Sequence, residues 1–258
     1  MNKLYKYIGQ KTLDLSYIMK QQSIKTYVEP FGGSFNVGLN LSIKNKDIRL
    51  IYNDIDEIQY NIWKYTKENI FKFLDKADEL IEKFNDFGEL DEILHYIDIA
   101  DDFEQTVGHY ILLNSIRFNN NSTFEEIDKL DYNPEFIMDF IDVSKRIEIN
   151  NLSYEEIIDN YDSEDTFFFF DPPYYMNKTD GYYRANCKYF YHKEFAKRVK
   201  QIKGKFLITY NISDYISELF NEYRQDSYIA NKYKKTLYIR NFDIDENIWS
   251  KIINTYDY

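Results

Sequence analysis

The stretch Thr166–Tyr175, TFFFFDPPYY, decides the fold of this chain. Four consecutive phenylalanines end in Asp171-Pro172-Pro173-Tyr174. A short, wholly apolar run bounded by turn residues predicts a strand that is buried on both faces, as in a parallel sheet. Because two consecutive prolines cannot donate hydrogen bonds to a sheet, the strand must end there.

The tetrapeptide after this strand predicts a functional site. It presents a carboxylate, a rigid carbonyl-bearing corner and an aromatic ring at the carboxyl end of a strand, where ligands bind in open α/β sheets. An Asp-Pro turn that only closes a strand is the simpler alternative. The whole tetrapeptide directly after such a strand is much rarer than that turn. We therefore expect Asp171, Pro172 and Tyr174 to belong to a functional site.

Composition excludes several classes of protein. The 258 residues contain no apolar run long enough to span a membrane, and the N-terminus lacks the apolar core of a signal peptide. A single cysteine, Cys187, and three histidines far apart in the sequence support neither a disulfide framework nor a metal site. We therefore expect a cytoplasmic protein with no membrane partner and no metal.

Charge is distributed unevenly along the chain. The formal net charge of −12 by itself argues against a nucleic-acid partner. However, residues 75–104 hold 12 acidic residues and only two lysines, whereas residues 171–240 hold 14 lysines and arginines and seven acidic residues. A duplex could therefore lie on the basic C-terminal half. For the acidic stretch, we prefer a solvated helical face over a partner-binding surface.

A second signal lies near the N-terminus. The short strand Thr26–Val28 ends at the glycine corner Glu29–Ser34, and a helix follows. That arrangement brings a backbone close to a nucleotide-like ligand. The next strand, Arg49–Tyr52, ends at Asp54, about 20 residues after the corner, where an acid binds ribose hydroxyls. Capping of the following helix is the alternative role for Asp54, and both roles could hold.

The alternation of strands and helices is interrupted once. From residue 57 to about residue 147 the periodicity is helical, with few strand signals. We therefore expect a catalytic domain formed by residues 1–60 and 147–258, with an inserted, mainly helical lobe at residues 61–146. Further strands are expected at residues 146–150, 167–170, 206–209 and 237–241, and further helices at 154–160, 192–203 and 212–220.

The order of these motifs resembles that of the Dam-type adenine-specific DNA methyltransferases over nearly the whole chain. The family opens with an aromatic-x-Gly-Gly/Asn-Lys motif, to which Tyr7–Lys11 is similar. Its Asp/Glu-x-Phe-x-Gly corner corresponds to Glu29–Gly33, its ribose acid to Asp54, and its Asp-Pro-Pro-Tyr motif to Asp171–Tyr174. The resemblance implies an α/β fold, a Rossmann-like S-adenosylmethionine-dependent methyltransferase sheet whose inserted lobe recognises the target.

The resemblance also implies roles for residues. Asp171 and the Pro172 carbonyl would accept hydrogen bonds from the exocyclic amine of an adenine flipped out of the duplex, and Tyr174 would stack on that base. The nitrogen would then attack the methyl group of S-adenosylmethionine. The residues expected to bind this cofactor are Tyr7, Lys11, Phe31, Gly33, Asp54, Tyr154 and Asp171. For the segment of Tyr154, a helix N-cap at Ser153 is an equally good explanation.

DNA contacts are expected from the lobe and from the segment after the catalytic motif. The resemblance identifies residues 114–119, NSIRFN, as the DNA-contacting loop of the lobe, with Arg117 and Asn119 at the DNA. An arginine that ends a helix is more often a solvated charge, so only the motif context favours this role. The basic residues that could neutralise phosphates around an extruded base are Arg184, Lys188 and Lys193.

Four departures from the family pattern are present. Gln10 replaces Gly or Asn in the opening motif, and Phe35 stands two residues after Gly33, where the family often has a further glycine. The Pro-Phe-Gly that usually follows the recognition loop is absent, and Lys234–Leu237 lacks the usual acid before the late strand. The third departure bears on the recognised DNA sequence, for which GATC, the commonest target among the closest relatives, is the expectation.

Two other functions remain open at this stage. One is a cofactor-binding regulatory protein that no longer methylates DNA, and the other is an RNA- or protein-directed amine methyltransferase. The intact tetrapeptide argues against the first. Asp171 argues against a glutamine amide, because family members that act on it typically carry Asn there. We therefore expect a methyltransferase specific for adenine in double-stranded DNA, acting as a monomer or a homodimer.

Overall fold

The computed structural model describes residues 13–87, 90–118, 124–127, 140–141, 143–175, 190–229 and 235–253, with the backbone alone for 116–118 and 124–127. The chain divides into two compact units. The larger contains the described parts of Lys11–Asp56 and Ile147–Tyr258. The smaller contains those of Glu57–Arg146, and helix α3 (Glu57–Glu68) lies wholly within it.

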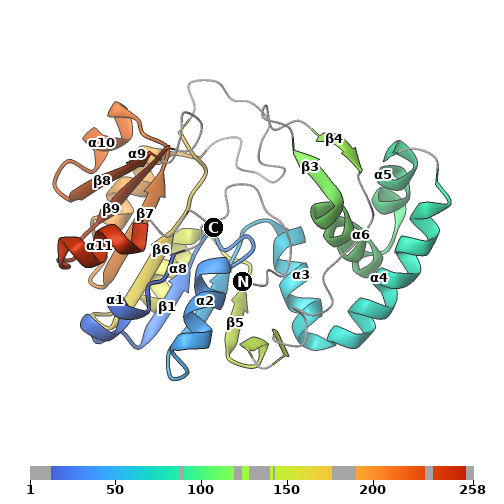
Figure 1. Ribbon diagram of the computed structural model, residues 1–258, viewed down its shortest axis with the longest axis horizontal. Coiled ribbons are helices and arrows are strands. Elements are labelled where there is room, and N and C mark those ends of the chain that lie inside the picture. The colour runs from blue at the N-terminus through green and yellow to red at the C-terminus, as the bar shows by residue number, and fades with distance from the viewer. Residues whose placement is uncertain are drawn as a thin grey trace. The chain divides into compact units, whose positions relative to one another are not determined.

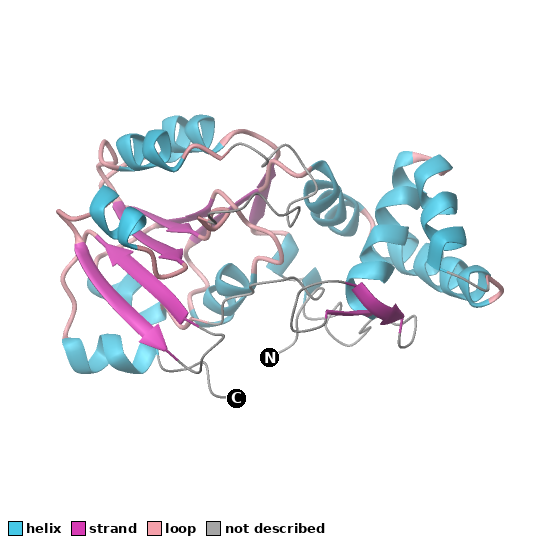
Figure 2. Ribbon diagram, turned by 90° about the horizontal axis from the view of Figure 1, so that it is seen from above, coloured by secondary structure: helices cyan, strands magenta, loops and turns pink. Residues whose placement is uncertain are grey.

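The larger unit is a seven-stranded sheet with helices on both faces (Figures 1 and 2). The order across the sheet is β5-β2-β1-β6-β7-β9-β8. The first five strands are mutually parallel, and β9 is antiparallel to both of its neighbours. The strands are β1 (Thr26–Glu29), β2 (Arg49–Asn53), β5 (Ile147–Asn150), β6 (Thr166–Phe170), β7 (Lys205–Tyr210), β8 (Arg224–Ile229) and β9 (Lys235–Arg240). The helices are α1 (Ser16–Gln21), α2 (Asn36–Lys44), α8 (Tyr154–Tyr161), α9 (His192–Val199), α10 (Asp214–Leu219) and α11 (Glu246–Ile253).

Strand β6 is the middle strand of the seven, and all five of its residues are buried. Phe168 is paired with Val28 of β1 on one side and with Phe206 of β7 on the other. Alternate phenylalanines point to opposite faces, so each face of the strand buries apolar rings under a helical layer. The expected strand that is buried on both faces is confirmed.

The strand order reverses direction between the neighbouring strands β1 and β6. From β1 the chain proceeds to β2 on one side, and from β6 it proceeds to β7 on the other side. Such a reversal of direction leaves the loops after the two central strands free to diverge, and ligands bind outside the carboxyl ends of the strands at this point. The two loops here are the glycine corner after β1 and the Asp171–Tyr174 tetrapeptide after β6.

The smaller unit is a helical bundle with one hairpin. Its further elements with defined bounds among the described residues are α4 (Ile70–Asn85), α5 (Leu90–Ile99), α6 (Asp102–Ser115), β3 (Ile116–Phe118) and β4 (Phe124–Ile127). Helix α6 packs against α3, α4 and α5, and its core includes an edge-to-face contact between Phe73 and Tyr110. The antiparallel pair β3–β4 was not expected from the sequence, where a helix was expected to run into a polar loop. Strands of three and four residues are too short to produce a readable alternation.

The acidic stretch of the smaller unit is partly neutralised within the unit itself. Lys76 lies 2.7 Å from Glu79 and 2.9 Å from Glu104, and Tyr96 also donates to Glu104. Asp102 accepts from Asn61. The Lys76–Glu79 pair lies within α4, and the other contacts join helices of one bundle, so part of the acidic stretch is paired internally.

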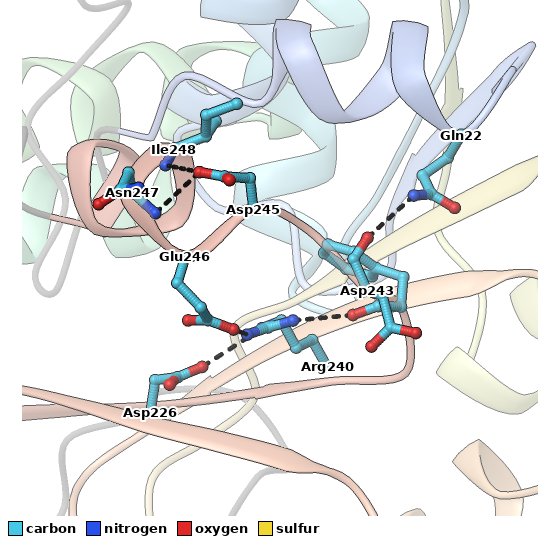
Figure 3. Close-up of polar contacts among 9 residues, drawn as sticks. Gln22, Asp226, Arg240, Asp243, Asp245, Glu246, Asn247 and Ile248 are labelled. Atoms are coloured by element: carbon cyan, nitrogen blue, oxygen red, sulfur yellow. Dashed lines mark hydrogen bonds and ion pairs between the residues drawn. The ribbon is translucent and has the colours of Figure 1, made fainter.

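The C-terminal edge of the sheet contains two elements that were not expected, β8 and α11. Arg240, at the end of β9, is only 1% exposed and joins them. Its guanidinium lies 3.3 Å from Asp226 on β8 and 3.0 Å from Glu246 on α11, and it donates to the Phe242 carbonyl (Figure 3). A buried charge requires such pairing, and only removal of both acids would leave the guanidinium without a counter-charge.

Within the described part of the chain, no helix is both long enough and apolar enough to cross a membrane.

Candidate active site

The tetrapeptide lies where the sequence places it, directly after β6. Asp171 and Tyr174 are half-buried, and both prolines are buried. The Asp171 carboxylate does not stand alone, because the Thr209 hydroxyl on β7 donates to its Oδ1 at 2.5 Å. The Asn211 side-chain amide donates to the Tyr175 carbonyl at 2.8 Å. The neighbouring strand therefore contacts the motif at its first residue and just beyond its last.

The glycine corner after β1 is bound to the end of β2. The Gly33 N–H donates to Asp54 Oδ2 at 2.8 Å, and the Gly32 N–H donates to the Asn53 carbonyl at 2.7 Å. A Cβ on Gly32 would lie 2.3 Å from the Tyr52 ring, so only glycine permits this close approach. Gly33 has a φ of 46°, which is a backbone conformation that favours glycine. The corner is thus a rigid turn held against the strand that carries Asp54.

Phe35 occupies the position two residues after Gly33 where a further glycine is often found. Its backbone has the left-handed conformation, with φ 52° and ψ 29°, which glycine adopts without strain. The Phe35 ring lies over Gly38, which is in the first turn of α2. A Cβ on Gly38 would lie 2.3–2.6 Å from atoms of this ring. Packing of this buried ring therefore offsets the strained backbone, and the absence of a side chain at position 38 makes room for it.

Glu29, at the end of β1, is buried and only 3% exposed. Its Oε1 accepts from the Tyr27 hydroxyl and from the Gly38 N–H, each at 2.7 Å. Burial raises the pKa of Glu29 to about 8, and the nearby negative charge of Asp171 adds to the rise against the two hydrogen bonds. Glu29 therefore links β1 to the first turn of α2. Its carboxyl also lies close enough to Asp171 for the two charges to interact.

Asp54 does not cap the helix that follows it. Its Oδ1 accepts from the Asp56 N–H at 2.9 Å, two residues on and ahead of the first residue of α3, while its Oδ2 binds Gly33. Burial of the carboxyl raises the pKa of Asp54 to about 7, opposed by these backbone donors. The residue keeps part of its surface exposed, and a carboxylate has about four acceptor positions, so it can still accept from ribose hydroxyls.

Asn53 joins three of the loops at this edge. Its side-chain nitrogen donates to the carbonyls of Pro30 and Leu152, both at 2.9 Å, and its oxygen accepts from the Leu152 N–H. The segment after β5 is thereby held beside the glycine corner. Sequence reasoning missed Asn53, although its place in an Asn-Asp pair at a strand end was visible.

Tyr154 belongs to an aromatic cluster beside the corner. Its ring centroid lies 5.7 Å from that of Phe31 and 5.8 Å from that of Phe190. Phe31 and Phe190 make an edge contact at 5.6 Å, and Phe195 of α9 packs against both Phe31 and Tyr154. The predicted helix N-cap at Ser153 is also present, because Ser153 and Glu156 form a complete capping box at the start of α8.

A second aromatic group surrounds Tyr174. Its ring centroid lies 6.1 Å from that of Tyr210, whose hydroxyl contacts His192 Nδ1 at 2.9 Å. His192 in turn makes an edge contact with Tyr175. Burial lowers the pKa of His192 to about 4, so the imidazole is neutral at physiological pH. These residues pack against the tetrapeptide and support it. No pattern in the sequence predicted this group.

The basic side chains of α9 are mostly engaged with acids. Lys197 pairs with Glu194 at 2.8 Å, and Lys200 pairs with Glu222 at 3.0 Å. Arg198 pairs with Asp159 of α8. Lys193, at the start of α9, is exposed and makes no ion pair with another described residue. Lys193 is therefore more available to a DNA phosphate than Lys197, Arg198 or Lys200.

Several expected site residues lie outside the part of the chain that the structure describes. These are Tyr7, Lys11, Asn119, Arg184 and Lys188. The backbone of Arg117 is in β3, but its side chain is not among those described. The residues that the structure does bring to the β1–β6 edge are Phe31, Gly33, Asp54, Tyr154, Asp171, Pro172 and Tyr174.

Comparison with known proteins finds relatives that are named as methyltransferases or methylases. The chain is 25% identical over 263 residues to Type II methyltransferase M.MjaIII of Methanocaldococcus jannaschii, with 88% of this chain and 90% of that protein covered. It is 27% identical over 251 residues to Type II methyltransferase M.CviBI of Paramecium bursaria Chlorella virus NC1A, covering 91% and 90%. Modification methylase LlaI of Lactococcus lactis subsp. lactis is 26% identical over 190 residues, covering 68% of this chain and 30% of that protein.

The model of one protein family matches residues 7–237, which is most of the chain and includes every motif described above. The expected resemblance to adenine-specific DNA methyltransferases is confirmed, and with it S-adenosylmethionine as the cofactor and DNA as the substrate. The chain belongs to the D12 class N6 adenine-specific DNA methyltransferase family.

Proposed function

We propose that this enzyme methylates the N6 amine of an adenine that it flips out of double-stranded DNA, with Asp171, Pro172 and Tyr174 as the catalytic residues. The observation that supports this most is the position of the tetrapeptide at the β1–β6 switch point, opposite the corner that binds Asp54. Both reactants of a methyl transfer must reach one crevice, and these two loops flank it.

The residues at the corner suit S-adenosylmethionine. The Asp54 carboxylate would accept the ribose hydroxyls, and Phe31 and Tyr154 offer apolar rings to a purine. The close packing of Gly32 on Tyr52, where a Cβ would not fit, supports a glycine corner held tightly against β2. When bound, the cofactor supplies a methyl group on a positively charged sulfur. Lys11 and Tyr7 are proposed to complete its site.

Asp171 acts by orienting the amine. The lone pair of an adenine amine is delocalised into the ring, which makes it a poor nucleophile. Asp171 and the Pro172 carbonyl would accept one N–H each, which draws the nitrogen towards tetrahedral geometry and localises the lone pair that bonds to the methyl carbon. The two prolines fix that carbonyl before the base arrives, so the arrangement is preorganised. The amine loses its proton readily once methylated, so Asp171 need not be a strong base.

Tyr174 would stack on the flipped base. Stacking of a base on an aromatic ring contributes about 1–3 kcal/mol, comparable with the few kcal/mol that unstacking a base requires. The Tyr210 ring packs beside Tyr174, and the His192 contact holds Tyr210 in turn. This support favours a fixed ring over a mobile one, which lowers the entropy lost when the base binds.

The smaller unit is proposed to be the target-recognition lobe, with Arg117 and Asn119 contacting DNA. The position of Arg117 in a short strand of a hairpin supports this, because a two-stranded ribbon fits the major groove. Arg184, Lys188 and Lys193 would neutralise phosphates around the extruded base. GATC remains the proposed target sequence.

Two short duplexes of identical composition, one with GATC and one with those four base pairs scrambled, test the target. Transfer of labelled methyl groups to the GATC duplex alone would support it, and equal transfer to both would refute GATC recognition. A GATC duplex with 2-aminopurine in place of the target adenine tests base flipping. A large rise in fluorescence on binding is expected, and an unchanged signal from a bound duplex would refute flipping.

A further inference from the structure

The carboxyl end of β7 holds the catalytic tetrapeptide at two points. Thr209 and Asn211 are two residues apart, so in an extended chain their side chains point to the same side. The Thr209 hydroxyl donates to Asp171 Oδ1 at 2.5 Å, and the Asn211 amide donates to the Tyr175 carbonyl at 2.8 Å. The two contacts bracket the segment that contains both prolines and Tyr174.

The Thr209 contact restrains the side chain that the reaction depends on. Thr209 is fully buried, and its hydroxyl also lies 3.4 Å from the Phe170 carbonyl, so the carboxylate is its better acceptor. A hydrogen bond to a carboxylate is stronger than one between neutral groups. It restricts rotation of the carboxylate, and an acceptor with about four positions keeps capacity for an amine.

The Asn211 contact restrains the backbone beyond the motif. Its amide nitrogen binds Tyr175, while its amide oxygen is buried without a hydrogen-bond partner among the described residues. A buried polar atom without a partner destabilises the fold, and an apolar side chain would avoid that penalty. An amide at this position is therefore best explained by the contact that its nitrogen makes.

We propose that Thr209 and Asn211 are positioning residues for methyl transfer. Thr209 fixes the Asp171 carboxylate at the angle at which it accepts the target amine, and Asn211 fixes the exit of the tetrapeptide so that the Pro172 carbonyl and the Tyr174 ring keep their places. Neither residue touches the substrate. The inference rests on the proposed role of Asp171, and it adds that the orientation of this carboxylate is imposed from β7.

Thr209→Val tests the first contact, because it removes the hydroxyl and keeps the branched shape of a buried strand residue. We expect kcat to fall roughly 10- to 100-fold, the effect of one hydrogen bond to a charged group. The KM and the Kd for S-adenosylmethionine should change less than about twofold. Thr209→Ser restores the donor and should recover most of kcat. Asn211→Leu should lower kcat more modestly, again with cofactor affinity retained.

Thr166→Val is the matched control. Thr166 is a buried threonine at the opposite end of β6, and its hydroxyl donates to the Tyr161 carbonyl at 2.7 Å, away from the tetrapeptide. The Thr166→Val variant loses a buried hydrogen bond that does not involve the tetrapeptide. We therefore expect it to lower thermal stability, as Thr209→Val does, and to leave kcat unchanged. All variants are compared at a temperature at which circular dichroism shows each to be folded.

The outcomes are distinguishable. Wild-type kcat in Thr209→Val, or equal losses of kcat in Thr209→Val and Thr166→Val, would overturn the inference and leave the proposed function intact. A loss that Thr209→Ser does not recover would also overturn it. A wild-type enzyme that binds S-adenosylmethionine but transfers no methyl group to DNA would overturn the proposed function and this inference together.

Discussion

The ring of Phe35 occupies the space above Gly38, and each residue makes the other acceptable. Phe35 has a left-handed backbone, and a Cβ at position 38 would meet its ring at 2.3 Å. Together they complete a corner in which phenylalanine, not glycine, follows Gly33 by two residues. The contact between Phe35 and Gly38 therefore predicts both the sign and the size of the change in stability caused by Gly38→Ala.

Gly38→Ala should destabilise the protein by about 1–3 kcal/mol, because the added methyl overpacks the ring. In a Phe35→Gly background the same change should stabilise by up to about 1 kcal/mol, because alanine is favoured over glycine inside a helix. Denaturant unfolding of the four proteins of this cycle measures both effects. A Gly38→Ala change with the same sign in both backgrounds would show that the ring is not what excludes a side chain.

The buried carboxyl of Glu29 should make stability fall as pH rises. Its pKa is about 8 in the folded state and about 4.5 in the unfolded state, so between these values the folded protein binds more protons than the unfolded one. The free energy of unfolding therefore decreases with pH across this window. Glu29→Gln keeps both hydrogen bonds to Oε1 and should reduce the slope, because it removes this titration. Unfolding measured from pH 5 to pH 8.5 would refute this prediction if both proteins gave the same slope.

Asp54 should make cofactor affinity depend on pH in the opposite sense. Its pKa of about 7 means that the ionised form, which accepts ribose hydroxyls best, is lost as pH falls below that value. The Kd for S-adenosylmethionine should therefore rise up to about tenfold per pH unit below pH 7. Calorimetric titration of Asp54→Asn supplies the control, since any titration of the cofactor itself persists there. Wild-type pH dependence that survives in Asp54→Asn would exclude Asp54 as its source.

Lys193 should contribute to DNA affinity where Lys197 does not. Lys193 is exposed at the start of α9, whereas Lys197 is paired with Glu194. Lys193→Ala should weaken duplex binding and reduce the slope of log affinity against log salt by about 0.9, which corresponds to one phosphate contact. Lys197→Ala should leave the slope unchanged. Filter binding at several salt concentrations separates the two, and identical slopes in both variants would argue against a specific role for Lys193.

The central sheet was largely predictable from sequence because its strands are apolar runs. Thr166–Phe170 and Lys205–Tyr210 are buried on both faces, so their composition alone marks them. The edge strand Arg224–Ile229 reads RQDSYI and is largely polar, and it was missed because one face meets solvent. The antiparallel pair in the smaller unit was missed because strands of three and four residues span at most two periods, too few to show an alternation.

Some contacts in the candidate site could be predicted from local sequence patterns, and others could not. Gly33 and Asp54 are 21 residues apart, yet their contact follows from a known spacing between a glycine corner and the next strand end. The roles of Thr209, Asn211 and Asn53 depend on the register of neighbouring strands, and no local pattern reports that register. Their contacts became visible only when β6, β7 and the strand-end loops were placed side by side.

The most direct test of the account is the nucleoside composition of DNA treated with this enzyme. Unmethylated genomic DNA is incubated with labelled S-adenosylmethionine, digested to nucleosides and separated. With the wild-type enzyme, we predict that N6-methyl-2′-deoxyadenosine is the only labelled nucleoside. With Asp171→Ala, we predict that this label disappears while the variant still binds S-adenosylmethionine. Label that remains in Asp171→Ala, or DNA that stays unlabelled although the wild-type enzyme binds S-adenosylmethionine, would contradict the assignment of Asp171–Tyr174 as the site that methylates adenine in DNA.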